Sequence, residues 1–228
     1  MNELENRLGY CFRNGELLKT ALTHSSYVNE HPGEHAECYE RMEFLGDSIL
    51  GAVTAEYLYR FEPALPEGKM TGIRAELVCE ESLYRVAMAL NLGESMRLGK
   101  GEERSSGRRR PSLLADMVEA VIAAIWLDGG PEPARRFIMT HVLQDAEEKV
   151  IRHRLDHKTE LQELVQGVPG GSVRYQHLRA EGPDHNKLFT CAVYVNGRFA
   201  GEGSGHSKKE AEQAAAGAAL AGLAAEGS

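Results

Sequence analysis

Hydrophobic residues recur with a helical period over roughly the first 150 positions. The pattern predicts helices over 14–24 (NGELLKTALTH), about 38–59, 73–90, 113–128 and 132–150. Asn14 is placed to cap the first helix, and Gly129, Gly130 and Pro131 stop the helix before them. Residues 61–68 are rich in Pro and residues 98–112 in Gly, Ser and Arg, so both are predicted to be exposed loops.

The pattern changes near residue 155. Apolar and polar residues alternate in 171–182 and 187–203, which predicts strands, and Asn196-Gly197 predicts a type I′ hairpin turn. Helices are expected over 156–166 and in the Ala-rich stretch 207–226. The fold class is therefore a mainly α N-terminal domain over 1–150 and an α+β domain of order α-β-β-β-α over 155–225, joined by a charged stretch around 151–156.

Acidic residues interrupt the two most apolar helices. Glu40, Glu43 and Asp47 share one face of the first, since a helix turns by about 100° per residue. Asp116 and Glu119 are neighbours on the second, LLADMVEAVIAAIWLD. Any one of them can be a surface residue or the partner of an arginine such as Arg41 or Arg74. Two acidic groups inside apolar segments favour a site for a hard cation, because Mg²⁺ takes carboxylate oxygens and burying unpaired acids is costly.

The residues that accompany the acids on these helices indicate which chemistry the metal would serve. Di-iron carboxylate sites need Glu-x-x-His, which these helices lack, so redox chemistry is the weakest interpretation. Magnesium-assisted phosphoryl transfer is what remains.

The composition of the chain limits which binding partners and which cellular compartment are expected. A net charge of −8 argues mildly against nucleic-acid binding, so positive charge has to be concentrated locally. The N-terminus lacks an apolar signal segment and no apolar run can span a bilayer, which predicts a cytoplasmic protein with no membrane association. The four scattered cysteines are expected to be reduced, buried thiols.

Basic residues gather at two places. Lys208 and Lys209 open the last helix after Ser207, which can form a capping box with Glu210. Two lysines at a helix N-terminus oppose the helix dipole and make a site for phosphate. The triple arginine 108–110 fits phosphate contact and a solvated loop equally well.

Two long motifs carry a resemblance that covers essentially the whole chain. ERMEFLGDSIL (40–50) and PSLLADMVEAVIAAIWLDGG (111–130) resemble the paired signature of the ribonuclease III family, and ALTHSSY and GKGEERSSGR match its lesser landmarks. The C-terminal domain resembles the double-stranded-RNA-binding domain of bacterial members. Departures are small: Tyr39 stands where Asn is common, and Met42 and Met117 replace other residues, but none removes an acid.

The resemblance implies a Mg²⁺-dependent endoribonuclease in which Mn²⁺ can replace Mg²⁺. Its domain over 1–150, with a signature core to about 130, would hydrolyse double-stranded RNA to 5′-phosphate and 3′-hydroxyl ends with short 3′ overhangs. Its substrates would be rRNA precursors and other structured transcripts, including mRNA and tRNA precursors. A duplex-RNA-binding regulator that does not cut is the alternative, and the intact acids argue against it.

The resemblance also implies roles for single residues. The metal ligands would be Glu43, Asp116 and Glu119, the catalytic residues Asp47 and Glu119, and the auxiliary acids Glu40 and Glu67. Contacts to RNA would come from Thr159, Gln162, His185, Lys208 and Lys209.

Three further positions in the N-terminal domain are interpreted as packing residues. Gly46 is explained by close approach of another helix, and His24 is expected to be a packing residue rather than a general base. Phe44 lies about 100° around the helix from Glu43 and packs either into its own core or against a second subunit. The resemblance implies the second, in a homodimer.

Overall fold

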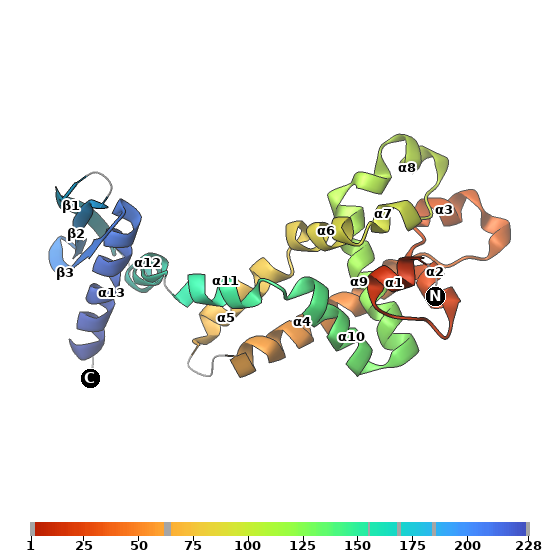
Figure 1. Ribbon diagram of the computed structural model, residues 1–228, viewed down its shortest axis with the longest axis horizontal. Helices are drawn as coiled ribbons and strands as arrows, with labels where there is room; N and C mark the ends of the chain where they lie inside the picture. Colours follow the sequence, from red (N-terminus) through yellow and green to blue (C-terminus); the bar gives the residue numbers. More distant parts are fainter. Residues whose placement is uncertain (1–2, 62–64, 155, 168–169, 184–185, 227–228) are drawn as a thin grey trace. The chain divides into compact units, whose positions relative to one another are not determined.

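The protein is described by a computed structural model that covers residues 3–61, 65–154, 156–167, 170–183 and 186–226. It divides into two compact units, Met1–Lys149 and Val150–Ser228, and each is described by itself (Figure 1). No helix within these ranges is both long and apolar enough to cross a membrane.

The first unit is built from helices. Their bounds are α1 Glu3–Leu8, α2 Gly15–Ala21, α3 Ser25–Glu30, α4 Glu40–Phe61, α5 Glu67–Leu77, α6 Glu80–Ala89, α7 Leu92–Ser95, α8 Lys100–Arg104, α9 Pro111–Gly129 and α10 Pro131–Phe137, with 3₁₀ turns Pro32–Glu34 and Gly107–Arg109 and a π-helical turn Ile138–Val142. Helix α11, Ala146–Arg154, begins in the first unit and ends in the second. Asn14 caps α2 by accepting a hydrogen bond from the Glu16 N–H, as predicted.

Helix α9 forms the centre of this unit. Leu114, Val118 and Ile122 are fully buried, and α9 packs most extensively on α4 and also contacts α2, α6 and α10. The predicted long helices 38–59 and 113–128 are thus confirmed as α4 and α9, with small shifts at their ends. Gly130, at a φ of 85°, ends α9, since a left-handed backbone suits glycine.

The single helix predicted over 73–90 is wrong. The structure has α5 and α6, separated at Val78 and Cys79, and Cys79 is extended (φ −69°, ψ 159°). The Glu76 carbonyl at the end of α5 accepts hydrogen bonds from Ser82 Oγ and from the buried Lys149 Nζ, both at 3.3 Å. Ile73 and Leu77 of α5 and Leu83 and Val86 of α6 are buried, so each helix has the apolar spacing of a helix and that spacing alone does not reveal the break between them. The loop predicted over 61–68 gives way to α5 at Glu67, and residues 62–64 lie outside the described chain.

The helix predicted over 132–150 is also divided. After α10 the Leu143 N–H donates to the Ile138 carbonyl at 3.0 Å, so the turn is widened by one residue before α11 begins. Ala146 and Val150 of α11 are buried. Helix α11 runs on to Arg154 and therefore through part of the stretch predicted to be a linker.

Residues 98–112 are more ordered than the predicted exposed loop, since they contain α8 and a 3₁₀ turn. The Arg108 guanidinium donates to the carbonyls of Gly93 (2.9 Å) and Met96 (2.7 Å) and pairs with Glu103 at 2.6 Å. Arg110 pairs with Glu102 at 2.7 Å. Arg108 therefore stabilises the end of α7. Neither of the two roles expected from the sequence, phosphate contact or a solvated loop, includes these contacts.

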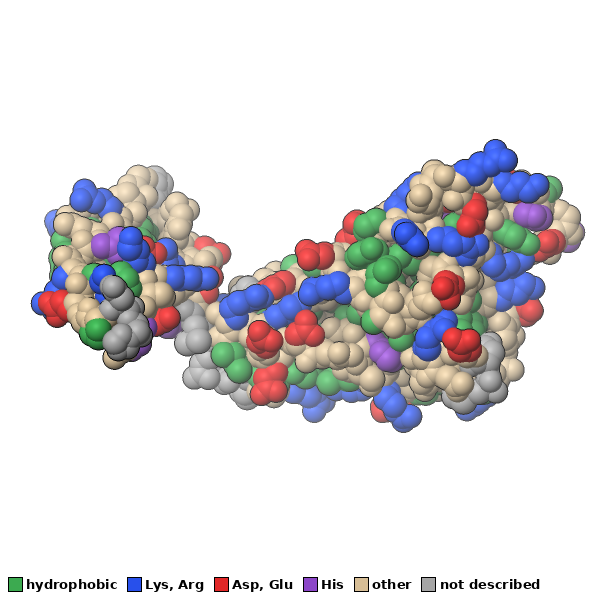
Figure 2. All heavy atoms as spheres, turned by 45° about the horizontal axis from the view of Figure 1, so that its top comes forward, with side chains coloured by type: hydrophobic (Ala, Val, Ile, Leu, Met, Phe, Trp, Pro, Cys, Tyr) green, Lys and Arg blue, Asp and Glu red, His purple; other side chains and the backbone are tan. Residues whose placement is uncertain are grey.

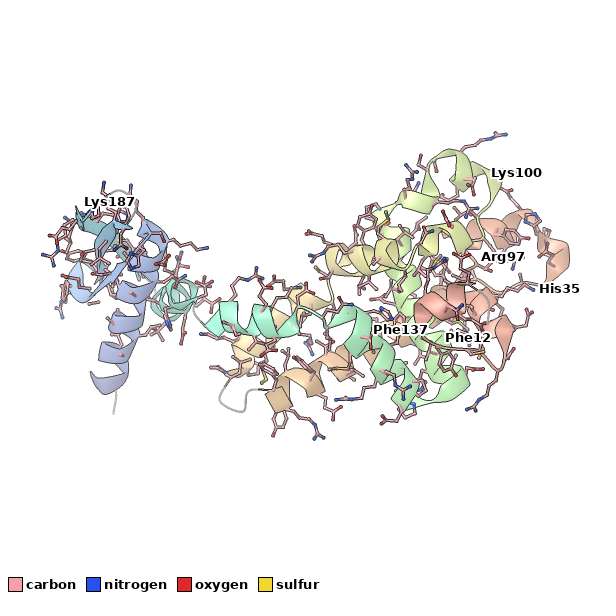
Figure 3. All side chains as sticks on the ribbon, viewed as in Figure 1. Phe12, His35, Arg97, Lys100, Phe137 and Lys187 are labelled. Carbon is pink, nitrogen blue, oxygen red and sulfur yellow. The ribbon has the colours of Figure 1, made fainter. Side chains whose placement is uncertain are left out.

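Arg97 fixes the segment that follows α2 (Figure 3). Its N–H donates to the Leu22 carbonyl at 2.8 Å, and its carbonyl accepts from the His24 N–H at 3.0 Å. Its guanidinium donates to Thr23 Oγ1 at 3.2 Å and pairs with Glu34 at 2.9 Å. Together, these hydrogen bonds and the ion pair hold Thr23 and His24 beside the start of α4.

The second unit has the predicted α-β-β-β-α order. Its elements are α12 His157–Gln166, β1 Val173–Glu181, β2 Leu188–Val195, β3 Arg198–Gly205 and α13 Lys208–Glu226, and the antiparallel sheet has the order β1-β2-β3. Asn196 (φ 50°) and Gly197 (φ 76°) are both left-handed, which confirms the type I′ turn. The predicted fold class is confirmed for both units.

The small residues of α13 allow it to lie directly on the sheet. A Cβ placed on Gly203 would come within 2.2 Å of the Ala215 backbone nitrogen, so only glycine fits at position 203. Leu161, Val165 and Cys191 complete the core beneath α12 and α13.

Charges and thiols on the surface differ in part from expectation. Lys and Arg side chains are interspersed with Asp and Glu on the face of each unit that Figure 2 presents. All four cysteines are free, but Cys11 and Cys79 are exposed and Cys38 is partly exposed, so the expectation of buried thiols is confirmed for Cys191 alone.

Candidate functional site

The site forms where α4 crosses α9. A Cβ on Gly46 would come within 1.9 Å of the Glu119 carbonyl oxygen, so the two backbones touch at this point. The close helix approach predicted for Gly46 is confirmed, and the partner is the segment that carries the second acidic pair. Only a residue without a side chain allows this contact. As a result, Glu43 and Asp47, on either side of Gly46 along α4, are brought against Glu119.

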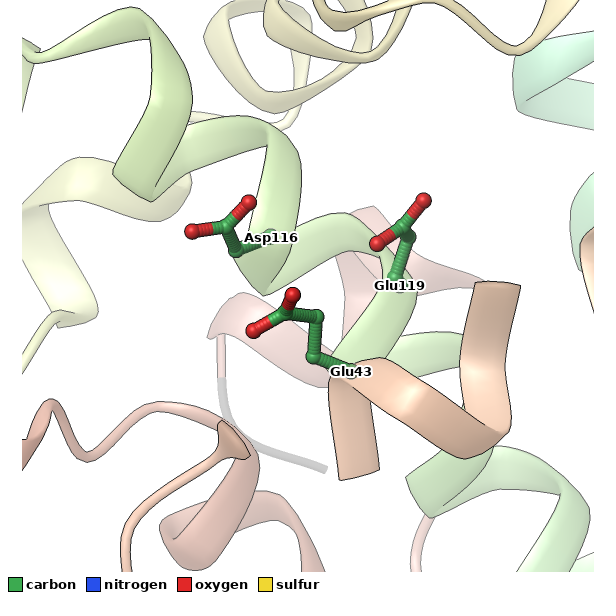
Figure 4. A group of neighbouring side chains, drawn as sticks. All are labelled: Glu43, Asp116 and Glu119. Atoms are coloured by element: carbon green, nitrogen blue, oxygen red, sulfur yellow. The ribbon is translucent and has the colours of Figure 1, made fainter. Parts of the chain in front are cut away.

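Three carboxylates converge at this crossing (Figure 4). Glu43 of α4 and Asp116 and Glu119 of α9 each place a carboxylate oxygen within 4.8 Å of the others, and all three residues are half-buried. Such an all-oxygen donor set is suited to a hard divalent cation. We call these three residues the acidic trio.

The acidic trio is electrostatically unfavourable without a cation. Burial, followed by the charges of Asp47 and Glu43, raises the pKa of Glu119 from 4.5 to about 8. Burial and the charge of Asp116 raise the pKa of Glu43. Groups that resist ionisation in this way release protons when a cation binds, so the donor set fits a metal ion by charge as well as by geometry.

Asp116 has neighbours that sequence reasoning missed. Burial and the charge of Glu80 raise its pKa, whereas His24 and a hydrogen bond from the Tyr39 side chain lower it. Glu80 and Tyr39 come from segments with no periodic relation to α9, so only the tertiary structure reveals these contacts. His24 Nδ1 accepts from the Ser26 N–H at 3.1 Å and caps α3, which agrees with a packing role.

The other predicted acids lie around or away from the acidic trio. Asp47 and Glu40 are exposed on α4 and outside the trio, but their charges act on Glu119 and Glu43 respectively. Glu67 opens α5, accepts a hydrogen bond from Thr71 at 2.9 Å, and lines a groove beside the C-terminal half of α4. That groove lies roughly 20 Å along α4 from Glu43, so this chain does not bring Glu67 to the trio.

Phe44 is 78% exposed although it is a large aromatic residue in a well-packed helix. Ser48, one turn further along α4, lines a neighbouring groove of about 380 Å³ together with Ala52, Trp126 and Arg135. Phe44 is therefore not packed into the core of its own domain.

Four of the predicted RNA-contacting residues of the second unit, Thr159, Gln162, Lys208 and Lys209, lie on its two helices. Lys208 and Lys209 are exposed in the first turn of α13, and Ser207 accepts from the Glu210 N–H at 3.1 Å, which confirms its role as a cap. In return, the Glu210 carboxylate accepts a hydrogen bond from the His206 N–H at 2.9 Å. On α12, Thr159 Oγ1 donates to Asp156 at 2.8 Å and Gln162 is exposed. His185 lies outside the described residues.

Protonation of Glu119 predicts a pH-dependent stability difference. Because its folded pKa of about 8 exceeds 4.5, the folded metal-free protein binds more protons than the unfolded chain between these values and loses stability as pH rises through them. We expect Glu119→Gln to become progressively more stable than wild type from about pH 5 to about pH 8, measured by thermal unfolding with a chelator present. A stability difference that stays constant over this range would contradict the assignment.

Comparison with known proteins identifies both units. Residues 14–146 match the ribonuclease-III-like family, and residues 157–223 match the double-stranded RNA binding motif. The chain is 48% identical over 218 residues to Ribonuclease 3 of Geobacillus kaustophilus (strain HTA426), covering 96% of this chain and 89% of that protein. It is 50% identical over 219 residues to Ribonuclease 3 of Pelotomaculum thermopropionicum, covering 95% and 90%. The nuclease domain of ribonuclease III from Campylobacter jejuni superposes with a TM-score of 0.57 at 38% identity, covering 62% of this chain and 94% of that one.

A helical nuclease domain with an acidic trio, followed by a domain that binds double-stranded RNA, defines a ribonuclease that acts on RNA duplexes. The chain belongs to the ribonuclease III family. It is an endoribonuclease specific for double-stranded RNA, and processing of rRNA is typical of its family.

Proposed function

We propose that Glu43, Asp116 and Glu119 hold Mg²⁺, with Mn²⁺ able to replace it. The observation that carries this proposal is the convergence of three carboxylate oxygens within 4.8 Å at the crossing of α4 and α9. Hard oxygen donors favour a hard divalent cation over a softer metal. The raised pKa values of Glu43 and Glu119 reflect burial and crowded negative charge, which a cation would offset.

A cation held by Glu43, Asp116 and Glu119 would supply stabilisation of the negative charge that develops on the phosphate during hydrolysis. Asp47 and Glu119 would orient the attacking water and the substrate phosphate. Because Glu119 would also be a metal ligand, it would take part both in holding the cation and in orienting the water and the phosphate. Glu40 and Glu67 are auxiliary acids near a scissile phosphate, and the distance of Glu67 from the acidic trio leaves room for it to act on RNA bound along α4.

The products provide the test of this chemistry. Hydrolysis by attack of water on the phosphorus, with the 3′-oxygen as leaving group, gives 5′-phosphate and 3′-hydroxyl ends, and offset cuts in the two strands give short 3′ overhangs. We expect the fragments of a long RNA duplex to be digested by a 5′-phosphate-dependent exonuclease and to be ligated without prior phosphorylation. Fragments with 5′-hydroxyl or cyclic-phosphate ends would contradict the proposed reaction.

We further propose that Thr159, Gln162 and His185 contact the minor groove of the RNA and that Lys208 and Lys209 contact phosphates. The exposed lysines at the N-terminus of α13 support the phosphate contact, because free N–H groups and two ammonium ions attract an anion. Contacts to 2′-hydroxyls select duplex RNA by shape rather than by sequence. Thr159 would exchange its bond to Asp156 for an RNA 2′-hydroxyl.

The active form is proposed to be a homodimer with Phe44 in its two-fold interface. Its 78% exposure and the neighbouring groove on α4 and α9 support this, because a second subunit would bury both. The nuclease domain of Campylobacter jejuni ribonuclease III has a region involved in dimer formation. Two subunits would supply one acidic trio for each strand of a duplex.

Removing the Phe44 ring tests the interface. We expect Phe44→Ala to raise the dimer dissociation constant at least about a hundredfold, because truncating a buried phenylalanine costs about 3 kcal/mol or more. Sedimentation velocity should detect monomers on dilution, with cleavage recovering at high protein concentration. Phe199→Ala, which removes an exposed phenylalanine from the second unit, should sediment like wild type. A wild type that is monomeric at micromolar concentration and still makes paired cuts would refute the dimer.

We also propose the limits of the two domains and the cellular role of the protein. A nuclease domain over 1–150, with its signature core to about 130, and an RNA-binding domain over 155–225 are supported by the two family matches and by the division of contacts between Lys149 and Val150. Its substrates would be rRNA precursors and structured mRNA and tRNA transcripts, processed in the cytoplasm.

A further inference from the structure

Gln213, in the second turn of α13, joins the two helices that carry the proposed RNA contacts. Helix α12 packs against α13, and Gln213 is half-buried (Figure 1). Its side-chain Nε2 donates to the Asp156 carboxylate at 2.9 Å, and its Oε1 accepts from the Lys158 backbone N–H at 2.9 Å. Both polar atoms of this side chain are therefore bonded to the start of α12.

The two groups that Gln213 contacts organise the first turn of α12. Asp156 is the N-cap of this helix, and its carboxylate accepts from the Thr159 backbone N–H at 3.2 Å and from the Thr159 hydroxyl at 2.8 Å. The Lys158 N–H is one of the groups that a helix start leaves without a partner inside the helix, and Gln213 supplies that partner. Gln213 thus completes from α13 the cap that Asp156 begins, and it holds the carboxylate that orients Thr159.

Gln213 is also close to the end of α13 that carries the two exposed lysines. Lys209 precedes it by four residues, so the two lie on one face of the helix about 6 Å apart along its axis. One turn further on, a Cβ placed on Gly217 would come within 3.1 Å of the His157 ring. The start of α12 therefore lies along this face of α13, and the position of Thr159 relative to Lys209 depends on the contact.

We propose that Gln213 is a positioning residue for the recognition of duplex RNA, which holds Thr159 at the spacing from the α13 lysines that an A-form duplex requires. This inference rests on the proposed RNA contacts of Thr159, Lys208 and Lys209. A duplex presents its 2′-hydroxyls and its phosphates at distances fixed by its helical geometry. Contacts made from two protein helices can therefore act together only if those helices keep one spacing.

Discrimination between two duplexes measures positioning separately from stability. Binding of the full-length protein to an RNA duplex and to an RNA–DNA hybrid of the same sequence is measured by electrophoretic mobility shift, with a chelator present so that neither is cut. The hybrid lacks the 2′-hydroxyls of one strand, so the ratio of the two dissociation constants reports on contacts to these groups. We expect Gln213→Leu, which loses both hydrogen bonds, to weaken binding of the RNA duplex about tenfold and to remove most of the preference for it.

Ala218→Gly is the control for a loss of stability alone. Ala218 is exposed on α13, and glycine there should lower the melting temperature because it disfavours the helix, with the preference for the RNA duplex unchanged. Thermal unfolding shows whether each variant is folded at the temperature of the binding assay. If Gln213→Leu does not fold, Gln213→Glu tests the same contact, since it keeps the side-chain size but cannot donate to Asp156. Its added charge weakens binding of both duplexes alike and cancels in the ratio.

Thr159→Ala separates this inference from the proposed function. We expect it to lose the preference as well, and the double variant with Gln213→Leu to lose little more, because Gln213 acts through Thr159. Wild-type preference in Gln213→Leu, with the preference lost in Thr159→Ala, removes the role of Gln213 and leaves the RNA contact intact. Independent losses that multiply in the double variant, or an equal loss in Ala218→Gly, also remove that role. Wild-type preference in Thr159→Ala shows that the proposed RNA contact is wrong, and the inference falls with it.

Discussion

Glu119→Gln is expected to abolish most RNA cleavage and to leave duplex binding intact. Glutamine keeps the size of the side chain but removes the negative charge through which we propose that Glu119 acts on the metal and the attacking water. A transition-state contribution of several kcal/mol corresponds to about two to four orders of magnitude in rate. RNA affinity should persist, since the proposed RNA contacts of the second unit are unchanged. Single-turnover cleavage and an electrophoretic mobility shift with the same long RNA duplex measure the two properties.

The control for this variant removes an equal charge elsewhere. Glu148 is exposed on α11, so Glu148→Gln should cleave and bind like wild type. If Glu119→Gln cleaves at a near-normal rate, the acidic trio is not the catalytic site. If it fails to bind RNA, the separation between binding and chemistry is wrong.

Gly46→Ala is expected to disrupt both the fold and the site. A methyl group at this position would lie 1.9 Å from the Glu119 carbonyl oxygen, so α4 and α9 must move apart by about 1.5 Å to reach ordinary contact. Overpacking against a backbone that cannot turn aside should cost about 3 kcal/mol in the free energy of unfolding. A displacement of this size at the trio should also lower cleavage about a hundredfold. Urea unfolding and cleavage assays measure these two effects.

Gly101→Ala serves as the matched helical substitution. A Cβ on Gly101 meets no atom within 4 Å, so alanine there should leave the free energy of unfolding unchanged or raise it by up to about 1 kcal/mol. If Gly46→Ala unfolds at the same urea concentration as wild type, the backbone contact between α4 and α9 is not as close as described.

The features that the sequence predicts best are those encoded by local spacing. The intervals between Glu43, Gly46 and Asp47 give one helix face, and the interval between Asp116 and Glu119 gives another, whatever the rest of the chain does. The apolar character of α9 requires it to be central, so the two acidic faces have few ways to meet. The Asn196-Gly197 turn is similarly local, because its backbone angles suit these two residues.

Features that depend on distant segments are not predictable in this way. The break between α5 and α6 is stabilised by Lys149, which contacts the Glu76 carbonyl from a distant helix. The contacts of Arg108 with backbone carbonyls, and the effect of the Glu80 charge on the pKa of Asp116, likewise arise only when the chain is folded. The exposure of Phe44 belongs to the same class, since periodicity gives its direction on α4 and not what lies opposite.

Cleavage of a long RNA duplex by the wild-type protein, with Mg²⁺ or with a chelator and read on a denaturing gel, tests the metal-dependent nuclease directly. Single-stranded RNA and a DNA duplex of the same sequence serve as controls. Both RNA strands are expected to be shortened only in the duplex and only with Mg²⁺. Cleavage that continues in the chelator would contradict the metal site, and a duplex that is bound but left uncut at saturating Mg²⁺ would contradict the nuclease itself.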